Sequence, residues 1–112
     1  MKNMNNKCWE YAKRIAEEAE TYYNGTTNED GEEVGLYDYF ADALDYEAIL
    51  NSNKTLTAVR VYVTLGGPSC WIDTEAHAVI CIWGTDRAEY LIDGDLCDEL
   101  EEIVAECMEL DR

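Results

Sequence analysis

The chain has 112 residues, a formal net charge of −17 at neutral pH and a hydrophobic content of 47%. This length predicts a single domain over residues 1–112 that buries about 65% of its unfolded surface, and the apolar content excludes a disordered acidic tail. The acidic excess repels free nucleic acid and anionic membranes but attracts basic proteins. Solubility is the simpler explanation of the charge, although −17 is more than solubility requires.

The first predicted element is a helix over Asn5–Tyr23. Its apolar residues recur at spacings of three and four, which is the period of one buried helix face. These residues are Cys8, Ala12, Ile15, Ala19 and Tyr22. Asn24-Gly25 ends the helix, because glycine suits the left-handed position that follows a helix terminus.

Residues 26–35 are polar and show no periodicity, which predicts a loop. The helical period resumes over Leu36–Asp45. Its apolar positions are Leu36, Phe40, Ala43 and Leu44, and its outward positions are Asp38, Asp42 and Asp45. We therefore expect a second helix that ends at Asp45.

Several antiparallel strands are predicted next. Tyr46–Leu50 and Thr55–Leu65 form a hairpin around a polar turn at residues 51–54. Alternation along the second strand directs one set of residues toward the core: Val59, Val61, Val63 and Leu65. Gly66-Gly67-Pro68 then interrupts the strand, since proline cannot continue the ladder.

Ser69–Thr74 and Ala78–Gly84 predict a second hairpin. A two-residue turn at Glu75-Ala76 would place Cys70 opposite Cys81, whereas a shift of one residue would place Trp71 there. Neither turn residue favours positive φ, so both registers remain open. A final strand is predicted over Ala88–Ile92.

A last helix is predicted to start at Asp95 as its N-cap, with acids favourably placed in the first turns. Its buried stripe comprises Leu96, Leu100, Ile103, Val104 and Cys107. The order of elements predicts an α+β fold. We expect an antiparallel meander sheet of four to five strands, with two N-terminal helices and one C-terminal helix packed on one face.

The five cysteines have irregular spacings without a C-x₂-C pair, so the sequence predicts no zinc or other metal site, and it contains no cofactor motif. The first twenty residues lack the apolar stretch of a signal peptide, and the longest apolar run, Ala78–Trp83, is too short to span a bilayer. We therefore expect a cytoplasmic protein whose reduced thiols pack as small apolar side chains.

The single histidine, His77, falls at a predicted hairpin tip. A Cys–His nucleophile needs a thiol within hydrogen-bond reach of the imidazole, but Cys70 and Cys81 are predicted core positions. Carboxylates are so abundant that close pairs arise by chance and do not identify an acid–base site. We expect no enzymatic activity and no catalytic residue.

Two long segments are acidic and contain no Lys or Arg: residues 15–50 hold eleven acids and residues 93–111 hold nine. Four of the eight basic residues lie within the first fourteen positions. Carboxylates along helix faces imitate the charge row of a nucleic-acid backbone and would occupy a groove lined by Lys and Arg. The predicted partner-binding residues are Glu17, Glu18, Asp38, Asp42, Asp45, Trp71, Asp98, Glu102 and Glu106.

Three segments carry a resemblance: Leu36–Phe40 with Asp45–Glu47, Gly66–Thr74, and Trp83–Glu89. They resemble small acidic proteins encoded by phages and mobile elements of gut Firmicutes. Such proteins include anti-CRISPR and anti-restriction inhibitors. The resemblance implies an inhibitor of a bacterial defence nuclease such as Cas9, which would act as a DNA mimic toward a basic nucleic-acid-binding partner. It implies no catalytic residue.

An alternative of a different class is a non-enzymatic interaction or regulatory module, as a homodimer or with another protein. It would use a sheet surface that contains Trp71 and Trp83. A salt-insensitive dimer favours this alternative, whereas the contact of an acidic inhibitor weakens as salt rises. The sequence leaves the oligomeric state open.

Overall fold

The computed structural model describes residues 7–112. The elements within this range, in chain order, are α1 (Lys7–Asn24), β1 (Thr26–Thr27), β2 (Glu33–Val34), α2 (Leu36–Ala41), β3 (Asp45–Leu50), β4 (Leu56–Thr64), β5 (Ser69–Asp73), β6 (Ala78–Trp83), β7 (Asp86–Leu91) and α3 (Gly94–Met108). β3 to β7 form one antiparallel meander in sequence order, and β1 pairs with β2 separately. The predicted α+β fold is confirmed.

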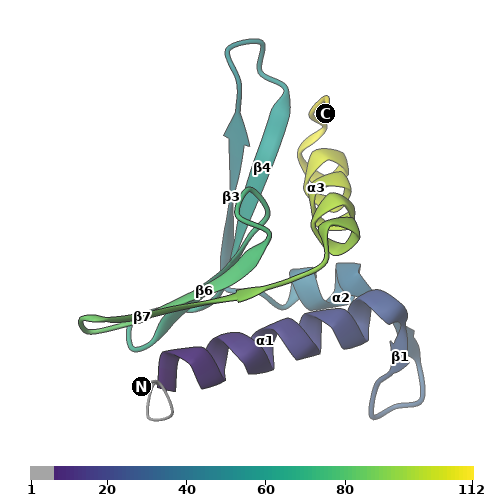
Figure 1. The fold of residues 1–112 in the computed structure, drawn as a ribbon. Coiled ribbons are helices and arrows are strands. Elements are labelled where there is room, and N and C mark those ends of the chain that lie inside the picture. Colours follow the sequence, from purple (N-terminus) through teal and green to yellow (C-terminus); the bar gives the residue numbers. More distant parts are fainter. Residues whose placement is uncertain (1–6) are drawn as a thin grey trace.

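The large sheet twists strongly, so that its two ends project as separate hairpins. β3 and β4 rise to the top of Figure 1, whereas β6 and β7 run to the left. α1 lies beneath β6 and β7, and α3 lies beside β4. The molecule is a plate with principal extents of 43 × 42 × 24 Å.

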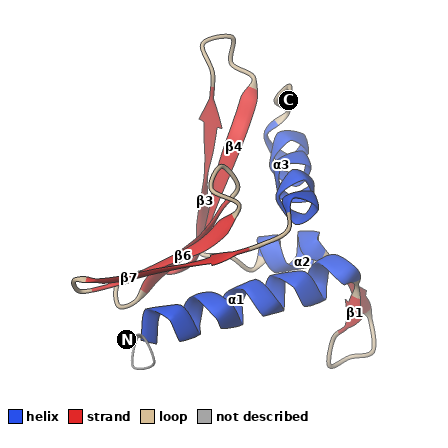
Figure 2. Cartoon of the chain, viewed as in Figure 1, coloured by secondary structure: helices blue, strands red, loops and turns tan. Residues whose placement is uncertain are grey.

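All three helices cover one face of the large sheet (Figure 2). Side chains of that face, such as Val61, Ile72 and Val79, share one buried cluster with residues of α1, α2 and α3. The opposite face carries Tyr62, Trp71 and Ile80 in one row across the strands, and none of these belongs to that cluster. We call this opposite side the helix-free face.

The predicted first helix is confirmed, although its first two positions lie outside the described residues. Cys8, Ala12, Ile15 and Ala19 are buried, and Tyr22 is half-buried at the end of the stripe. The loop predicted over residues 26–35 is wrong in part, because it contains the short β1–β2 ladder. The Asn28 side chain organises its turn by accepting bonds from the N–H groups of Asp30 and Glu32, each at 2.9 Å.

The second helix is shorter than predicted and ends at Ala41 rather than Asp45. The chain turns at residues 42–44, and the Leu44 N–H bonds to the Tyr62 carbonyl at 2.9 Å, so this segment already belongs to the sheet. Leu44, predicted to be buried, is 61% exposed. Helical periodicity wrongly predicted that residues 42–45 continue the helix, because the apolar residues at the helix–strand junction keep the helical spacing.

The strand predictions hold closely, with one correction to the core face. Val59 and Val61 are buried and Val63 is half-buried, but Leu65 lies beyond the end of β4 and is 53% exposed. The Gly66-Gly67-Pro68 corner begins there, where Gly66 has φ +107° and its N–H bonds to the Ser69 hydroxyl. Because Leu65 is not part of the strand, the alternation of β4 does not direct its side chain toward the core.

The register of the β5–β6 hairpin places Cys70 opposite Cys81 and Ile72 opposite Val79. This is the first of the two predicted alternatives. The turn spans residues 74–77. The Asp73 carboxylate accepts bonds from the N–H groups of Glu75 and Ala76, and His77 takes the positive φ of 51° that closes the turn. A buried carboxylate thus stabilises a turn that contains no glycine.

α3 starts two residues earlier than predicted. Asp93, not Asp95, is the N-cap, and its carboxylate accepts a 2.9 Å bond from the Asp95 N–H. Leu96, Leu100 and Val104 are buried as predicted, and Ile103 is half-buried. Cys107 was predicted in this stripe but is exposed. The buried face of α3 includes Cys97 and Ala105 in its place.

Replacing Asp93 by alanine is expected to lower the free energy of unfolding by about 1 kcal/mol, because a helix N-terminal N–H loses its acceptor. The same replacement of Asp95 should cost about a third as much, since it removes only a favourable charge near the helix N-terminus. Urea denaturation of both variants measures the difference. Equal losses would mean that Asp93 does not cap α3.

Candidate acidic interface

Carboxylates greatly outnumber their basic partners in the folded chain. All 25 acidic residues lie within residues 7–112, and six of them form ion pairs there with Arg60, Arg87 or Arg112. The other nineteen have no basic partner at ion-pair distance among the described residues. The negative charge of the surface is therefore largely uncompensated within the molecule.

Much of this charge gathers where the C-terminal end of α1, the β1–β2 ladder, α2 and the N-terminal end of α3 meet, at the lower right of Figure 1. Exposed acids without an ion pair on these elements and on the turns that adjoin them form what we call the acidic corner. Its members are Glu17, Glu18, Glu20, Glu29, Asp30, Glu32, Glu33, Asp38, Asp42, Asp93, Asp95 and Glu99. The segments that supply them contain no Lys or Arg.

Tyr23 shows that the two acidic segments meet in space. It lies at the end of α1, and burial raises the pKa of its phenol. Nearby carboxylates at the start of α3, led by Asp95 and Asp93, raise that pKa further. Residues about seventy positions apart in sequence therefore share one electrostatic environment.

Three of the predicted interface residues lie along α3, and two of them are partly neutralised. Arg112 folds back over the helix and pairs with Asp98 at 3.0 Å and with Glu102 at 2.9 Å, as well as with Glu101. Glu106 is exposed one turn further on. Asp98 and Glu102 are thus less available to a basic partner than the sequence implied.

The remaining predicted residues divide between two surfaces. Glu17, Glu18, Asp38 and Asp42 belong to the acidic corner, and Asp38 also caps α2 by accepting a 2.8 Å bond from the Gly35 N–H. The other two, on β3 and β5, have side chains on the helix-free face: Asp45 and Trp71. The structure therefore brings together only part of the predicted set.

Trp71 and Trp83 do not share a surface. Trp71 lies opposite Ile80 on the helix-free face, whereas Trp83 has the orientation of Cys81 and meets the ring of Tyr11 of α1 at 5.8 Å between centroids. A single sheet surface containing both tryptophans, as the alternative hypothesis assumed, is absent. Alternation along β6 separates them, and the sequence alone left the registers of the two strands open.

The acids of the β1–β2 ladder and of the α3 N-terminus were missing from the predicted interface. Glu29, Asp30, Glu32 and Glu33 were assigned to a structureless loop, and Asp93 lay before the predicted helix start. The available signal was the absence of Lys and Arg across both segments. Helical periodicity predicts outward positions only within helices, so it gave no prediction for the acids that lie between helices.

Basic residues occupy the other end of α1. The ammonium of Lys13 lies 5.4 Å from the ring centre of Trp9, and the guanidinium of Arg14 lies 4.7 Å from that of Tyr11. Such cation–π contacts keep the cations beside their own helix. α1 is consequently polarised, with cations toward its start and carboxylates toward the acidic corner.

A buried hydroxyl lies beneath the acidic corner. The Tyr39 side chain packs against Tyr22, with ring centres 5.2 Å apart, and its hydroxyl oxygen has no hydrogen-bond partner among the described residues. Burial raises the pKa of Tyr39 strongly, and the carboxylate of Glu18 raises it further. An unpaired buried hydroxyl destabilises the fold, since it loses its bonds to water.

Replacing Tyr39 by phenylalanine should therefore raise the free energy of unfolding by up to about 1 kcal/mol at neutral pH. Tyr39 stays protonated when folded but ionises near pH 10 when unfolded, so its contribution to stability falls as pH rises above about 10. The variant should lose less stability between pH 9 and pH 11 than the natural chain. Exposed Tyr37, replaced likewise, is the control for the loss of a phenol hydroxyl elsewhere on the surface.

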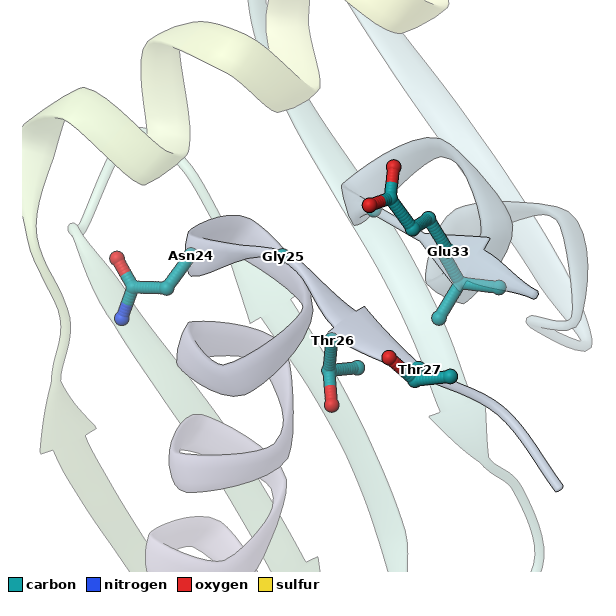
Figure 3. A pocket seen from close by; sticks show the side chains of 7 residues that line it. Asn24, Gly25, Thr26, Thr27 and Glu33 are labelled. Atoms are coloured by element: carbon teal, nitrogen blue, oxygen red, sulfur yellow. The ribbon is translucent and has the colours of Figure 1, made fainter. Parts of the chain in front are cut away.

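A hollow of about 520 Å³ lies beside the acidic corner and is lined by residues 24–27 and 33–35 (Figure 3). Its side chains do not converge on one point: Asn24 points away from Thr27 and Glu33 in this view. Among residues 7–112, no group of three or more His, Cys, Asp or Glu side chains is arranged to hold a metal ion. The hollow is therefore an open part of the acidic surface, with no built small-molecule site.

His77 is exposed in the β5–β6 turn, where its backbone carbonyl accepts a bond from the Ile92 N–H. Cys70 and Cys81 are wholly buried on the helix-covered side of the sheet. None of the described helices combines the length and the apolar composition that a membrane span requires.

A scan against protein-family models found no match to this chain, and searches of curated proteins and of solved structures found none either.

Proposed function

We propose that this protein is a cytoplasmic, non-catalytic inhibitor of a bacterial defence nuclease of the CRISPR-effector or restriction type. The observation that supports this most is the acidic corner, where twelve exposed carboxylates without an ion pair come from sequence segments that contain no Lys or Arg. It would occupy the Lys- and Arg-lined groove that normally holds nucleic acid, and would thereby block the natural ligand.

The electrostatics of such a contact favour this role over plain solubility. Solubility of a small domain needs a net charge of magnitude about 2–8, with both signs interspersed. Here the net charge is −17, and the signs are segregated along α1. A basic groove that binds phosphates also attracts a dense cluster of carboxylates. This attraction steers the acidic chain toward the groove.

A binding assay with a Cas9-type effector and a restriction nuclease, each tested for DNA cleavage, examines this proposal. We expect a complex at low salt and inhibition of DNA cleavage when the chain is in excess. Binding should weaken as the salt concentration rises, because the Debye length becomes shorter. Free duplex DNA and anionic vesicles should not bind the chain. The absence of a complex with any such nuclease at low salt would contradict the proposal.

A second candidate is an interaction module that uses the helix-free face, and one observation favours it. The indole N–H of Trp71 is buried and has no acceptor among the described residues, beside the ring of Tyr62 at 5.9 Å. A partner's carbonyl would supply that acceptor after displacing a side chain that covers the N–H. Sedimentation would then detect a dimer or complex that resists salt and is lost in Trp71→Ala. A monomer that is unaffected by the substitution would exclude this candidate.

A further inference from the structure

Two thiols meet directly across the centre of the large sheet. Cys70 of β5 and Cys81 of β6 are paired residues in the antiparallel register, and their side chains share the helix-covered face. Their Sγ atoms are 2.7 Å apart, and both residues are wholly buried. This separation is shorter than the usual non-bonded contact between two sulfur atoms and about 0.7 Å longer than a disulfide bond.

A third thiol adjoins this pair. Cys8 of α1 is buried in the same cluster, and its Sγ lies 3.7 Å from the backbone carbonyl of Asp86. Burial raises the pKa of Cys81, and contacts with Cys70 and then Cys8 raise it further. Cys97 and Cys107 lie on α3, and no hydrogen bond joins either to another thiol in the described range. The geometry thus singles out Cys70 and Cys81.

We propose that Cys70 and Cys81 are a dithiol that hydrogen peroxide oxidises to an intramolecular disulfide. One thiolate attacks a peroxide oxygen, the O–O bond breaks, and a sulfenic acid and one water form after proton transfer. The second thiol then attacks the sulfenic sulfur, the S–O bond breaks, and a second water leaves. The two thiols lose two electrons and two protons in total, and the peroxide is reduced to two waters.

The fold accommodates this bond with little movement. The Sγ atoms must approach from 2.7 Å to about 2.04 Å, which is within the reach of small side-chain rotations. Since the two residues already face each other across a ladder, the β5–β6 hairpin needs no change of register. Hydrogen peroxide is small enough to enter during local opening of the sheet, whereas a bulky disulfide reagent is not.

The reaction should be slow at neutral pH. The thiolate is the attacking species, and the raised pKa of Cys81 keeps its concentration low. Exposed Cys107 should react first, and the disulfide should form faster as pH rises. Oxidation of Cys107 followed by slower, pH-dependent disulfide formation distinguishes a buried dithiol from oxidation of surface thiols alone.

The test treats the natural, folded chain with hydrogen peroxide and maps its peptides by mass spectrometry without reduction. We expect a linked peptide pair containing Cys70 and Cys81, two hydrogens lighter than the separate peptides, that reverts with a thiol reductant. Circular dichroism should be unchanged. In a Cys107→Ser chain, which cannot cross-link through its exposed thiol, Tm should rise by about 10 °C on oxidation, because the bond restricts the unfolded chain.

Matched variants make the assignment specific. Cys81→Ala and Cys70→Ala should each abolish both the linked peptide and the rise in Tm, whereas Cys97→Ser should leave the linkage in place. The peptide map of the natural chain decides the question even if a core variant fails to fold. Oxidation confined to Cys107, or linkage mainly through Cys8 or Cys97, would overturn the proposal.

Discussion

A variant with five amides in place of acidic-corner carboxylates is expected to bind a basic nuclease about 100-fold more weakly than the natural chain, because each substitution removes attraction to a Lys- or Arg-lined groove. The substitutions are Glu17→Gln, Glu18→Gln, Asp42→Asn, Asp95→Asn and Glu99→Gln. None of these side chains caps a helix or forms an ion pair in the described structure, so the fold should be retained. Titration of a labelled effector at low salt measures the change.

The matched control changes the net charge by the same amount at exposed acids away from the corner. Its substitutions are Glu10→Gln, Asp86→Asn, Glu106→Gln, Glu109→Gln and Asp111→Asn. We expect this control to bind within about threefold of the natural chain, since long-range attraction is screened at moderate salt. Equal losses in both variants would show that total charge, rather than the corner, governs binding.

Replacing Ile72 by alanine should lower the free energy of unfolding by about 3–4 kcal/mol. Ile72 is wholly buried at the centre of the sheet, opposite Val61 and Val79, and helices cover its face. Its truncation leaves a cavity between the sheet and the helices that neighbouring strands cannot close. The loss is a large part of the stability of a small domain, which is about 5–15 kcal/mol.

Ile82→Ala is the control for that substitution. Ile82 lies on the helix-free face and is half-buried, so its truncation should cost about 1 kcal/mol. Urea denaturation of both variants gives the comparison. Similar losses would mean that the helix-free face is packed as tightly as the covered one, which contradicts the arrangement of a single core.

The fold could be predicted from sequence because each element carries its own periodicity. The stripe of α1 and the alternation of β4 follow from local spacing alone. The failures occurred at junctions, where local signals compete: Asp93 and Asp95 are both suitable N-caps, and Leu44 continues a helical period after the helix has ended. Tertiary contacts decide such cases, as the bond from the Leu44 N–H to Tyr62 shows.

The acidic interface was only partly predictable. The acidic segments are visible in the sequence, but their meeting around Tyr23 depends on how α1 and α3 pack on the sheet. The pairing of Arg112 with Asp98 and Glu102 depends on the path of the C-terminal residues, which no local pattern specifies. The strand registers were needed to predict that Trp71 and Trp83 lie on opposite faces of the sheet.

Competition with DNA shows whether the chain occupies the nucleic-acid groove of its partner. A labelled copy of the chain is bound to a Cas9-type effector, and unlabelled target DNA is added at constant salt. A decoy in the nucleic-acid groove predicts that the apparent Kd of the chain increases linearly with DNA concentration and that no ternary complex forms. A stable complex that contains the effector, the DNA and the chain together would exclude the proposed decoy role.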